Sequence, residues 1–351
     1  MTEAFVQGAA ARQEESAAPP GPASRPRGPW RQALSQIARD RVAMGSVVVL
    51  LLIVVACLMA PLYARYIAHT NPFQSNILGT TIVNGKSVQV LQPDTQGLGL
   101  GSAPIGPTWH GNYFLGADQE GRDVMARLLY GSRTTLLIGT ASAAVCCIVA
   151  AVLGLIAGYF GGAVDWILSR LFDLVWAFPV YLLAISLAVV LLTSGIHLGP
   201  IQVGPGSLLV PILIIALIYI PYVARPLRGQ VLSLKEREFI QAAVGVGVAD
   251  LRIIRKEVLP NILPAIIVYF PLMVALGMLT ESALSFLSIG VQPPQASWGT
   301  IINDGMSLLY NRPAVAIAPG VLLVITTVAL NLLGDSVRDA LDPRVRLRGS
   351  V

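Results

Sequence analysis

Long runs of apolar residues, separated by shorter polar stretches, dominate the chain between residues 42 and 333. Six of these runs are long enough, or nearly so, to cross a hydrocarbon core, which needs roughly 20 helical residues. The predicted spans are 42–62, 134–158, 172–193, 208–223, 262–280 and 314–333. The pattern therefore predicts an all-α polytopic membrane protein with six transmembrane helices.

Composition and charge support this class and orient the chain. Hydrophobic residues make up 54% of the sequence and charged residues 12%, and the mean hydropathy is +0.69. If the N-terminus is cytoplasmic, 18 of the 24 Lys and Arg residues lie on the cytoplasmic side, as the positive-inside rule requires. We expect both termini in the cytoplasm, the lipid bilayer as surroundings and, since no soluble basic face is evident, no nucleic-acid partner.

The same pattern divides the chain into five parts. We expect a disordered cytoplasmic tail (1–30), an interfacial helix with the first span (31–62), an extracytoplasmic insertion (63–117), a five-span core (118–333) and a cytoplasmic C-terminal tail (334–351). A simple positive anchor is an equal alternative to the interfacial helix. In the insertion, Asn84-Gly85 between two β-rich runs predicts a hairpin.

A second interfacial helix is predicted just before the second span, with Asp118 or Asp123 as its N-cap. We expect its apolar residues to face lipid and its arginines to reach the lipid headgroups. These residues are Val124, Leu128 and Leu129, and Arg122, Arg127 and Arg133.

No residue pattern indicates catalysis, a metal site or a bound cofactor. The "GKS" at 85–87 resembles a phosphate-binding loop, but five residues rather than four separate it from the preceding glycine, and it lies on the outer side. We therefore expect that this chain does not hydrolyse ATP. The spans carry almost no ionisable residues, which weighs against an ion-coupled secondary transporter.

One cytoplasmic segment, within residues 224–261, is long and patterned. Ser233 and Glu236 form a predicted capping box, and the first helix presents Phe239, Ile240, Ala243 and Val244 on one side. Gly245 and Gly247 interrupt it. Asp250 is the predicted cap of a second helix that shows Leu251, Ile254 and Val258 and ends at Pro260. Neither helix can cross a membrane, so we interpret the segment as a docking element for a soluble partner. A surface loop that covers the helix ends is the alternative.

The stretch "QAAVGVGVADLRIIRKEVLP" resembles the signature of ABC-importer permeases. Gln241, Ala242 and Ala243 match its Glu-Ala-Ala, Gly247 follows at the signature spacing, and Leu259-Pro260 matches its end. Gln241 stands where the family has glutamate; it keeps the length and the hydrogen-bonding capacity of that residue but loses its charge. Three further segments, 116–133, 281–299 and 331–346, resemble the second permease subunit of dipeptide, oligopeptide and nickel importers.

The resemblance implies an importer-permease fold in the prokaryotic cytoplasmic (inner) membrane. Its implied partners are a homologous permease, two cytoplasmic P-loop ATPases that carry ATP and Mg, and an extracytoplasmic substrate-binding protein. Residues 241–243, Gly247, Asp250, Leu259 and Pro260 would form the coupling helix region that contacts an ATPase. Glu281, Arg122 and Asp123 are candidates for a gate or a partner contact, with plain helix-end capping as the alternative for Glu281. A di- or oligopeptide is the expected cargo; nickel or another non-peptide cargo, and an ATP-independent carrier, are the alternatives.

Overall fold

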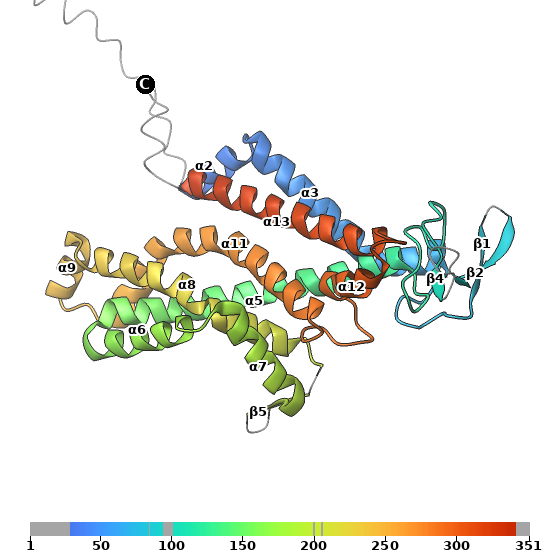
Figure 1. Cartoon of the computed structure of the whole chain (residues 1–351). Coiled ribbons are helices and arrows are strands. Elements are labelled where there is room, and N and C mark those ends of the chain that lie inside the picture. The colour runs from blue at the N-terminus through green and yellow to red at the C-terminus, as the bar shows by residue number, and fades with distance from the viewer. Residues whose placement is uncertain (1–28, 84, 94–100, 199–200, 205, 342–351) are drawn as a thin grey trace, which may run out of the picture.

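The computed structural model describes residues 29–83, 85–93, 101–198, 201–204 and 206–341 as a bundle of long helices (Figure 1). The chain begins with a short helix, α2 (Pro29–Ile37), and a long one, α3 (Arg41–Leu58). A single turn, α4 (Ala60–Leu62), and the π-helical η1 (Tyr63–Ala68) then lead to the outer side. The predicted disordered tail lies almost entirely outside the described residues.

The remaining long helices form the bundle. They are α5 (Val124–Phe160), α6 (Gly162–Trp176), α7 (Val180–Ser194), α8 (Leu209–Lys235), α11 (Leu259–Phe286) and α13 (Ala314–Leu341), with the shorter α12 (Trp298–Gly305) and η3 (Met306–Leu308) before the last. Among the described residues, five helices are long and apolar enough to cross a membrane, or six if α6 and α7 count as one bent span. The predicted all-α polytopic class is confirmed.

The third predicted span, 172–193, is wrong as a single straight helix. Its residues belong to α6 and α7, which meet at 88°. Pro179 stands at the break as the N-cap of α7, with an extended ψ of 129°. Proline lacks a backbone N–H and disfavours helical geometry in the residue before it, so the helix stops there and restarts in a new direction.

Two predicted spans end too early at their cytoplasmic ends. The span 208–223 continues in α8 to Lys235, and the span 314–333 continues in α13 to Leu341, so the expected C-terminal tail begins as helix. The fourth span was predicted to end where charged residues begin, but in the structure these residues remain in α8 because they form ion pairs with α6. Arg225 binds Asp173 of α6 at 2.7 Å, and Arg228 binds Asp165 of the same helix.

The centre of the bundle depends on close approach of α5 to α8. A Cβ atom on Gly154 would lie 2.7 Å from the carbonyl oxygen of Ala224, and one on Gly158 would lie 2.7 Å from Cβ of Val231. Small residues four positions apart let transmembrane helices pack backbone to backbone. The pair Gly154–Gly158 is such a pattern, and it fixes α5 against α8 across the main apolar core.

Three short strand pairs lie among the described residues: β1–β2 and β3–β4 at the end of the molecule opposite α9, and β5–β6 beside the end of α7 (Figure 1). The antiparallel pairs are β1 (Thr80–Val83) with β2 (Lys86–Gln89), β3 (Leu91–Pro93) with β4 (Ser102–Pro104), and β5 (Ile196–Leu198) with β6 (Ile201–Val203). Val83 pairs with Lys86, which leaves a two-residue turn where Gly85 has φ of 77°. The predicted hairpin is confirmed, although Asn84 lies outside the described residues.

Candidate functional site

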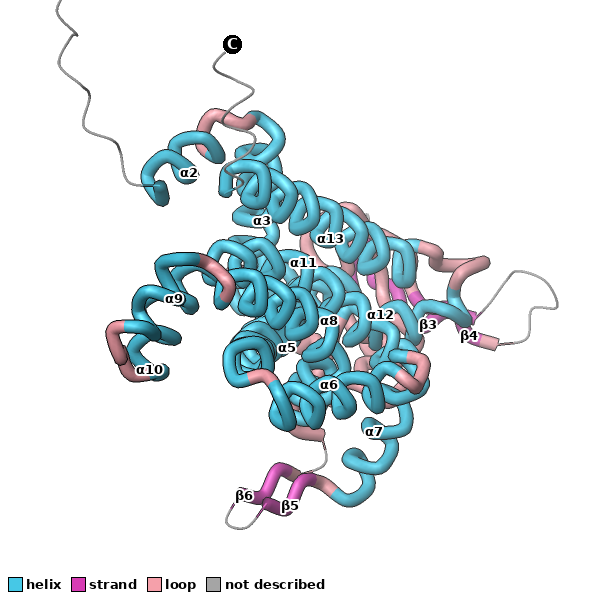
Figure 2. The backbone as a smooth tube through the Cα atoms, turned by 90° about the vertical axis from the view of Figure 1, so that its left-hand side faces the viewer, coloured by secondary structure: helices cyan, strands magenta, loops and turns pink. Residues whose placement is uncertain are grey.

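The predicted docking segment forms a compact cytoplasmic unit (residues 238–258) that projects beside the bundle (Figure 2). It consists of α9 (Glu238–Gly245), α10 (Asp250–Ile253) and the π-helical η2 (Ile254–Val258), which continues directly into α11. At the other end of the bundle lies a group of charged side chains around α12.

A glycine-dependent turn separates α9 from α10. Gly247 has φ of 79°, in the left-handed region, and nothing lies within 4 Å of where its Cβ would be. Its N–H donates to the carbonyl of Val244 at 2.9 Å, and that of Val248 donates to Ala243 at 3.1 Å. These are the two bonds of a Schellman motif. The requirement at Gly247 is therefore conformational rather than steric.

Gln241 closes the corner between α8 and α9. Its side-chain amide Nε2 donates a 3.0 Å hydrogen bond to the carbonyl of Lys235, the last residue of α8. That carbonyl belongs to the final turn of the helix, which has no intrahelical partners. Since an ionised carboxylate can only accept hydrogen bonds, a glutamate at this position could not make this contact. The departure from the family signature therefore has a local structural use.

Tyr159, at the end of α5, ties the two ends of the cytoplasmic unit together. Its hydroxyl donates to Oδ1 of Asp250 at 2.8 Å, and its carbonyl accepts from Nζ of Lys235 at 2.7 Å. Sequence reasoning missed Tyr159, because it lies some 90 residues from Asp250 in the chain. The predicted cap role of Asp250 is wrong: Ala249 is the N-cap, and Asp250 is the first residue of α10.

The other predicted boundaries of this segment are also wrong. Ser233 lies inside α8 and Glu236 is the C-cap of that helix, so the two residues form no capping box. Pro260 does not end the second helix, because a π-helical turn precedes it. Leu259 N–H donates to the carbonyl of Ile254, five residues back, and Pro260 falls in the first turn of α11, where a missing N–H is tolerated.

The apolar residues of the cytoplasmic unit divide into an anchored set and an exposed set. Ile240, Ile253 and Val258 are buried in the main core. In contrast, Val246 is 84% exposed and Leu251 is 76% exposed. Phe239 and Val244 belong to the exposed set, so the single predicted face of the first helix is split between the two. We call Phe239, Val244, Val246 and Leu251 the exposed apolar surface.

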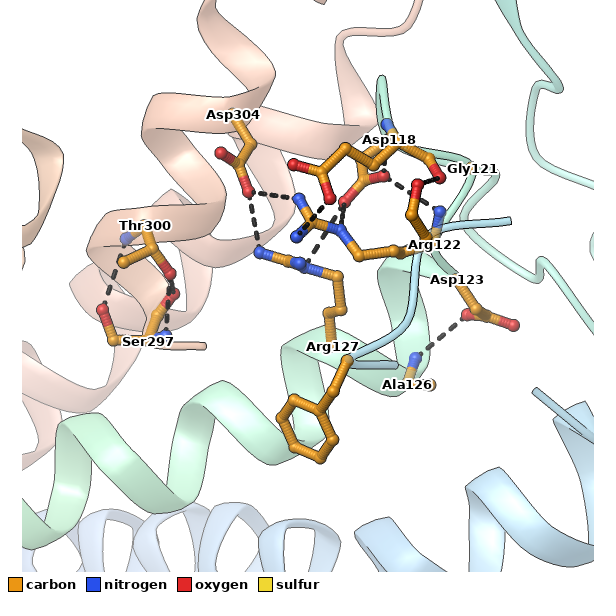
Figure 3. Close-up of polar contacts among 12 residues, drawn as sticks. Asp118, Gly121, Arg122, Asp123, Ala126, Arg127, Ser297, Thr300 and Asp304 are labelled. Carbon is orange, nitrogen blue, oxygen red and sulfur yellow. Dashed lines mark hydrogen bonds and ion pairs between the residues drawn. The ribbon is translucent and has the colours of Figure 1, made fainter. Parts of the chain in front are cut away.

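At the outer end, two buried arginines join the start of α5 to α12 (Figure 3). Arg122 Nε binds Asp118 at 2.7 Å, and its Nη2 binds Asp304 of α12 at 3.0 Å. Arg127 Nη2 binds the same Asp304 oxygen at 2.7 Å, while its Nε lies 3.4 Å from Asp118. Glu120 completes this outer ion-pair cluster with a 3.0 Å contact to Arg122.

The expected lipid-facing helix at this place is wrong. Arg122 and Arg127 are buried, and so are all three apolar residues predicted to face lipid: Val124, Leu128 and Leu129. Arg133 is partly buried, where it donates to the carbonyls of Cys57 and Leu58 at the end of α3. The local sequence could not reveal Asp304, which lies 177 residues beyond Arg127. Burial of the two arginines is possible because Asp118 and Asp304 compensate their charge.

Asp123, rather than Asp118, caps α5. Its Oδ1 accepts from the N–H of Ala126 at 3.0 Å, and its Oδ2 accepts from the N–H of Tyr113 at 2.7 Å. Burial raises the pKa of this carboxyl above its usual range, and the two backbone donors oppose that shift. The side chain is completely buried, so in this conformation it offers no surface to a partner. A gating role for Arg122 and Asp123 stays a prediction.

Glu281 lies inside α11 and is fully buried. Its Oε1 accepts from Ser285 at 2.7 Å. Trp298 of α12 is also buried, and its backbone N–H donates to Oγ1 of Thr135 of α5. Because α11 continues to Phe286, Glu281 is not a helix-end cap. Direct contact with a partner would require this packing to open, whereas a role in positioning α11 against α12 and α5 fits the burial.

Comparison with known proteins agrees with this architecture. Residues 150–347 match the family model described as "Binding-protein-dependent transport system inner membrane component". Residues 28–78 match the model of the N-terminal transmembrane domain of oligopeptide transport permease C. An inward-facing MetNI methionine ABC transporter structure has a TM-score of 0.51, with 19% identity over 62% of this chain and 97% of that chain. At that identity, the likeness concerns the fold alone.

Curated relatives resemble the chain over nearly its whole length. A dipeptide transport system permease protein from Alkalihalophilus pseudofirmus is 33% identical over 91% of both chains. An oligopeptide transport system permease protein from Haemophilus influenzae is 33% identical over 90% of this chain and 89% of its own. The chain therefore belongs to the binding-protein-dependent transport system inner membrane components, as a multi-pass permease subunit of the inner membrane.

Proposed function

We propose that this permease imports short peptides in an ATP-driven complex and that its cytoplasmic unit receives the motion of an ATPase. The peptide cargo is supported by the relatives named as dipeptide and oligopeptide permeases. A nickel or other non-peptide cargo has no specific observation in its favour. The observation that carries the coupling role is the exposed apolar surface on a rigid, anchored unit.

The anchoring suits transmission of force. Ile240 and Val258 fix the unit in the core shared by α5, α8 and α11, and Tyr159 links it to the end of α5. A displacement of α9 is therefore passed to three membrane helices rather than absorbed by a flexible loop. Alternating access would follow if those helices tilt when the ATPases close.

The remaining partners are proposed on the same basis. A sister permease would complete the pathway, an extracytoplasmic binding protein would deliver the cargo, and two ATPase subunits would bind ATP and Mg. This chain would contribute no catalytic residue and hold no cofactor. The exposed apolar surface would seat in a groove of one ATPase, which would remove Val246 and Leu251 from water.

The test is to place a charge on that surface. Val246→Asp and Leu251→Asp should each abolish co-purification of the ATPases and peptide uptake into vesicles, while the chain itself remains folded by size-exclusion chromatography. Ile82→Asp is the matched control, because Ile82 is 73% exposed on the opposite side of the membrane.

Two outcomes would contradict the proposal. Full ATPase recovery with both aspartate variants would mean that the exposed apolar surface is not the docking site. Peptide uptake by the purified chain in the absence of any ATPase would favour the ATP-independent carrier instead.

A further inference from the structure

A cavity of about 690 Å³ opens between the cytoplasmic ends of α8, α11 and α13. Three charged side chains line it: Arg237 at the α8–α9 corner, and Asp335 and Arg338 near the end of α13. Its other polar walls include Asn261 and Gln230. The function proposed above makes no use of this cavity.

The two arginines of the cavity are not satisfied by the chain itself. Within the part of the chain that the structure describes, neither Arg237 nor Arg338 has a side-chain hydrogen bond or an ion pair. Nearby Arg225 and Arg228 differ, since each binds an aspartate of α6. The cavity therefore holds two cations and a single carboxylate, an excess of positive charge.

The cavity lies at the depth of the inner-leaflet headgroups. Twenty-seven residues of α8 extend about 40 Å, roughly 10 Å more than a hydrocarbon core. The charged residues of α8 begin at Arg225, so the last turns, with Arg237 just beyond them, stand at or beyond the interface. Deeper in the cavity Val268 and Leu272 of α11 form an apolar stretch of wall, beside Tyr269 of the same helix and Asn331 of α13.

From this combination we propose that the cavity binds the headgroup of an acidic phospholipid. Basic pockets between transmembrane helices on the cytoplasmic side are suited to such headgroups. Arg237 and Arg338 would bind the phosphate, and Asp335 would accept a hydrogen bond from a headgroup hydroxyl. The apolar wall formed by Val268 and Leu272 would receive the start of an acyl chain, which a free phosphate ion could not use.

The position of Arg237 gives this site a consequence for coupling. Arg237 is the N-cap of α9, so a lipid held by Arg237 and Arg338 would connect the cytoplasmic unit to the end of α13. Acidic lipid in the inner leaflet would then stiffen the link between the unit and the bundle. The inference goes beyond the proposed function, because binding of the lipid requires neither ATPase nor cargo.

The test measures lipid retention by the full chain in nanodiscs of phosphatidylcholine with a minor fraction of phosphatidylglycerol. Native mass spectrometry after gentle release should find one phosphatidylglycerol retained per chain. Arg237→Gln and Arg338→Gln should each lower its retention about fivefold, as expected for loss of one basic side chain at a membrane surface. Arg39→Gln is the matched control: an exposed arginine on the same membrane face, outside the cavity. Arg→Lys variants should restore most of the retention.

Three outcomes would overturn the proposal. The first is equal retention of phosphatidylglycerol by the wild type and by the Arg237→Gln, Arg338→Gln double variant. A photoactivatable phosphatidylglycerol could label other helices and spare α8, α11 and α13. Inorganic phosphate alone could displace the lipid, which would make the site one for a free anion. Since retention is measured without ATPases, failure here and failure of the docking surface are separate results.

Discussion

The two ends of the molecule differ in how they accommodate side chains that are unfavourable in their surroundings. The cytoplasmic unit leaves Val246 and Leu251 in water, although burial of such side chains would be favourable by about 1.5–3 kcal/mol each. The outer ion-pair cluster instead buries Arg122 and Arg127 and supplies their partners from the same chain. The outer end pairs its buried charges within the chain, although Nη1 of Arg127 finds no hydrogen-bond partner among the described residues. The exposed apolar surface of the cytoplasmic unit is instead the part that we propose an ATPase covers.

The largest effect is expected from Asp118→Ala in the outer ion-pair cluster. This change leaves Arg122 and Arg127 buried with less compensating charge, and we expect a loss of about 3–5 kcal/mol in the free energy of unfolding. Thermal unfolding of the purified chain in detergent would measure it. Glu120→Ala is the matched control: Glu120 is 54% exposed within the same cluster, and we expect a change within about 0.5 kcal/mol. Equal losses in the two variants would contradict the distinction.

A second variant tests the close packing of α5 against α8, which connects the two ends of the molecule. Gly158→Leu would force a side chain against Val231 of α8, and we expect a loss of about 1–3 kcal/mol from overpacking. The control is Gly45→Leu in α3, since nothing lies within 4 Å of a Cβ there. Unchanged thermal stability of the Gly158 variant would mean that α5 and α8 can separate without cost.

At the cytoplasmic end, the decisive variant is Gly247→Leu. Because the backbone is left-handed here, the substitution should lower the free energy of unfolding by about 1–2 kcal/mol. The strain is confined to a turn at the surface. We expect normal expression with loss of coupled peptide transport, because the angle between α9 and α10 changes. Gly245→Leu is the control two residues away, without a positive φ. Normal transport by the Gly247 variant would refute the coupling role of this turn.

The smallest expected effect is that of Gln241→Glu, which installs the usual family residue. The carboxylate cannot donate to the carbonyl of Lys235, so about 0.5–1.5 kcal/mol should be lost locally. Hydrogen exchange at the α8–α9 corner would detect the faster opening. Glu238→Gln, on the exposed first turn of α9, should leave the exchange unchanged.

Periodicity and motifs predicted much of the fold, and the reason differs from one element to another. The span within α11 and the hairpin at Gly85 follow from local chemistry, namely apolar length and a turn residue that accepts positive φ. The segment that we propose for docking stands out in the sequence because its glycines and basic residues interrupt an apolar chain. The spacing of Gly154 and Gly158 is also typical of close helix packing, but only the structure shows that α8 lies against them.

What the sequence could not predict depends on partners distant along the chain. Arg127 looked like an interfacial arginine because Asp304 is 177 residues away, and Asp250 looked like a cap because Tyr159 could not be placed beside it. The end of α8 was misplaced for the same reason, since Arg228 stays helical through its pairing with Asp165. A charged residue in an apolar stretch predicts the end of a span unless the residue that pairs with it is known.

The sequence by itself therefore determined the class of the protein, its membrane orientation and the segment that we propose as the docking site. These properties come from the apolar length of helices, the distribution of positive charge and a local signature around Gly247. Only the tertiary structure decided which charges are buried, how α6 and α7 bend apart, and that Arg237 and Arg338 share a cavity. Such features arise from contacts between helices, and one-dimensional periodicity carries no record of which helices become neighbours.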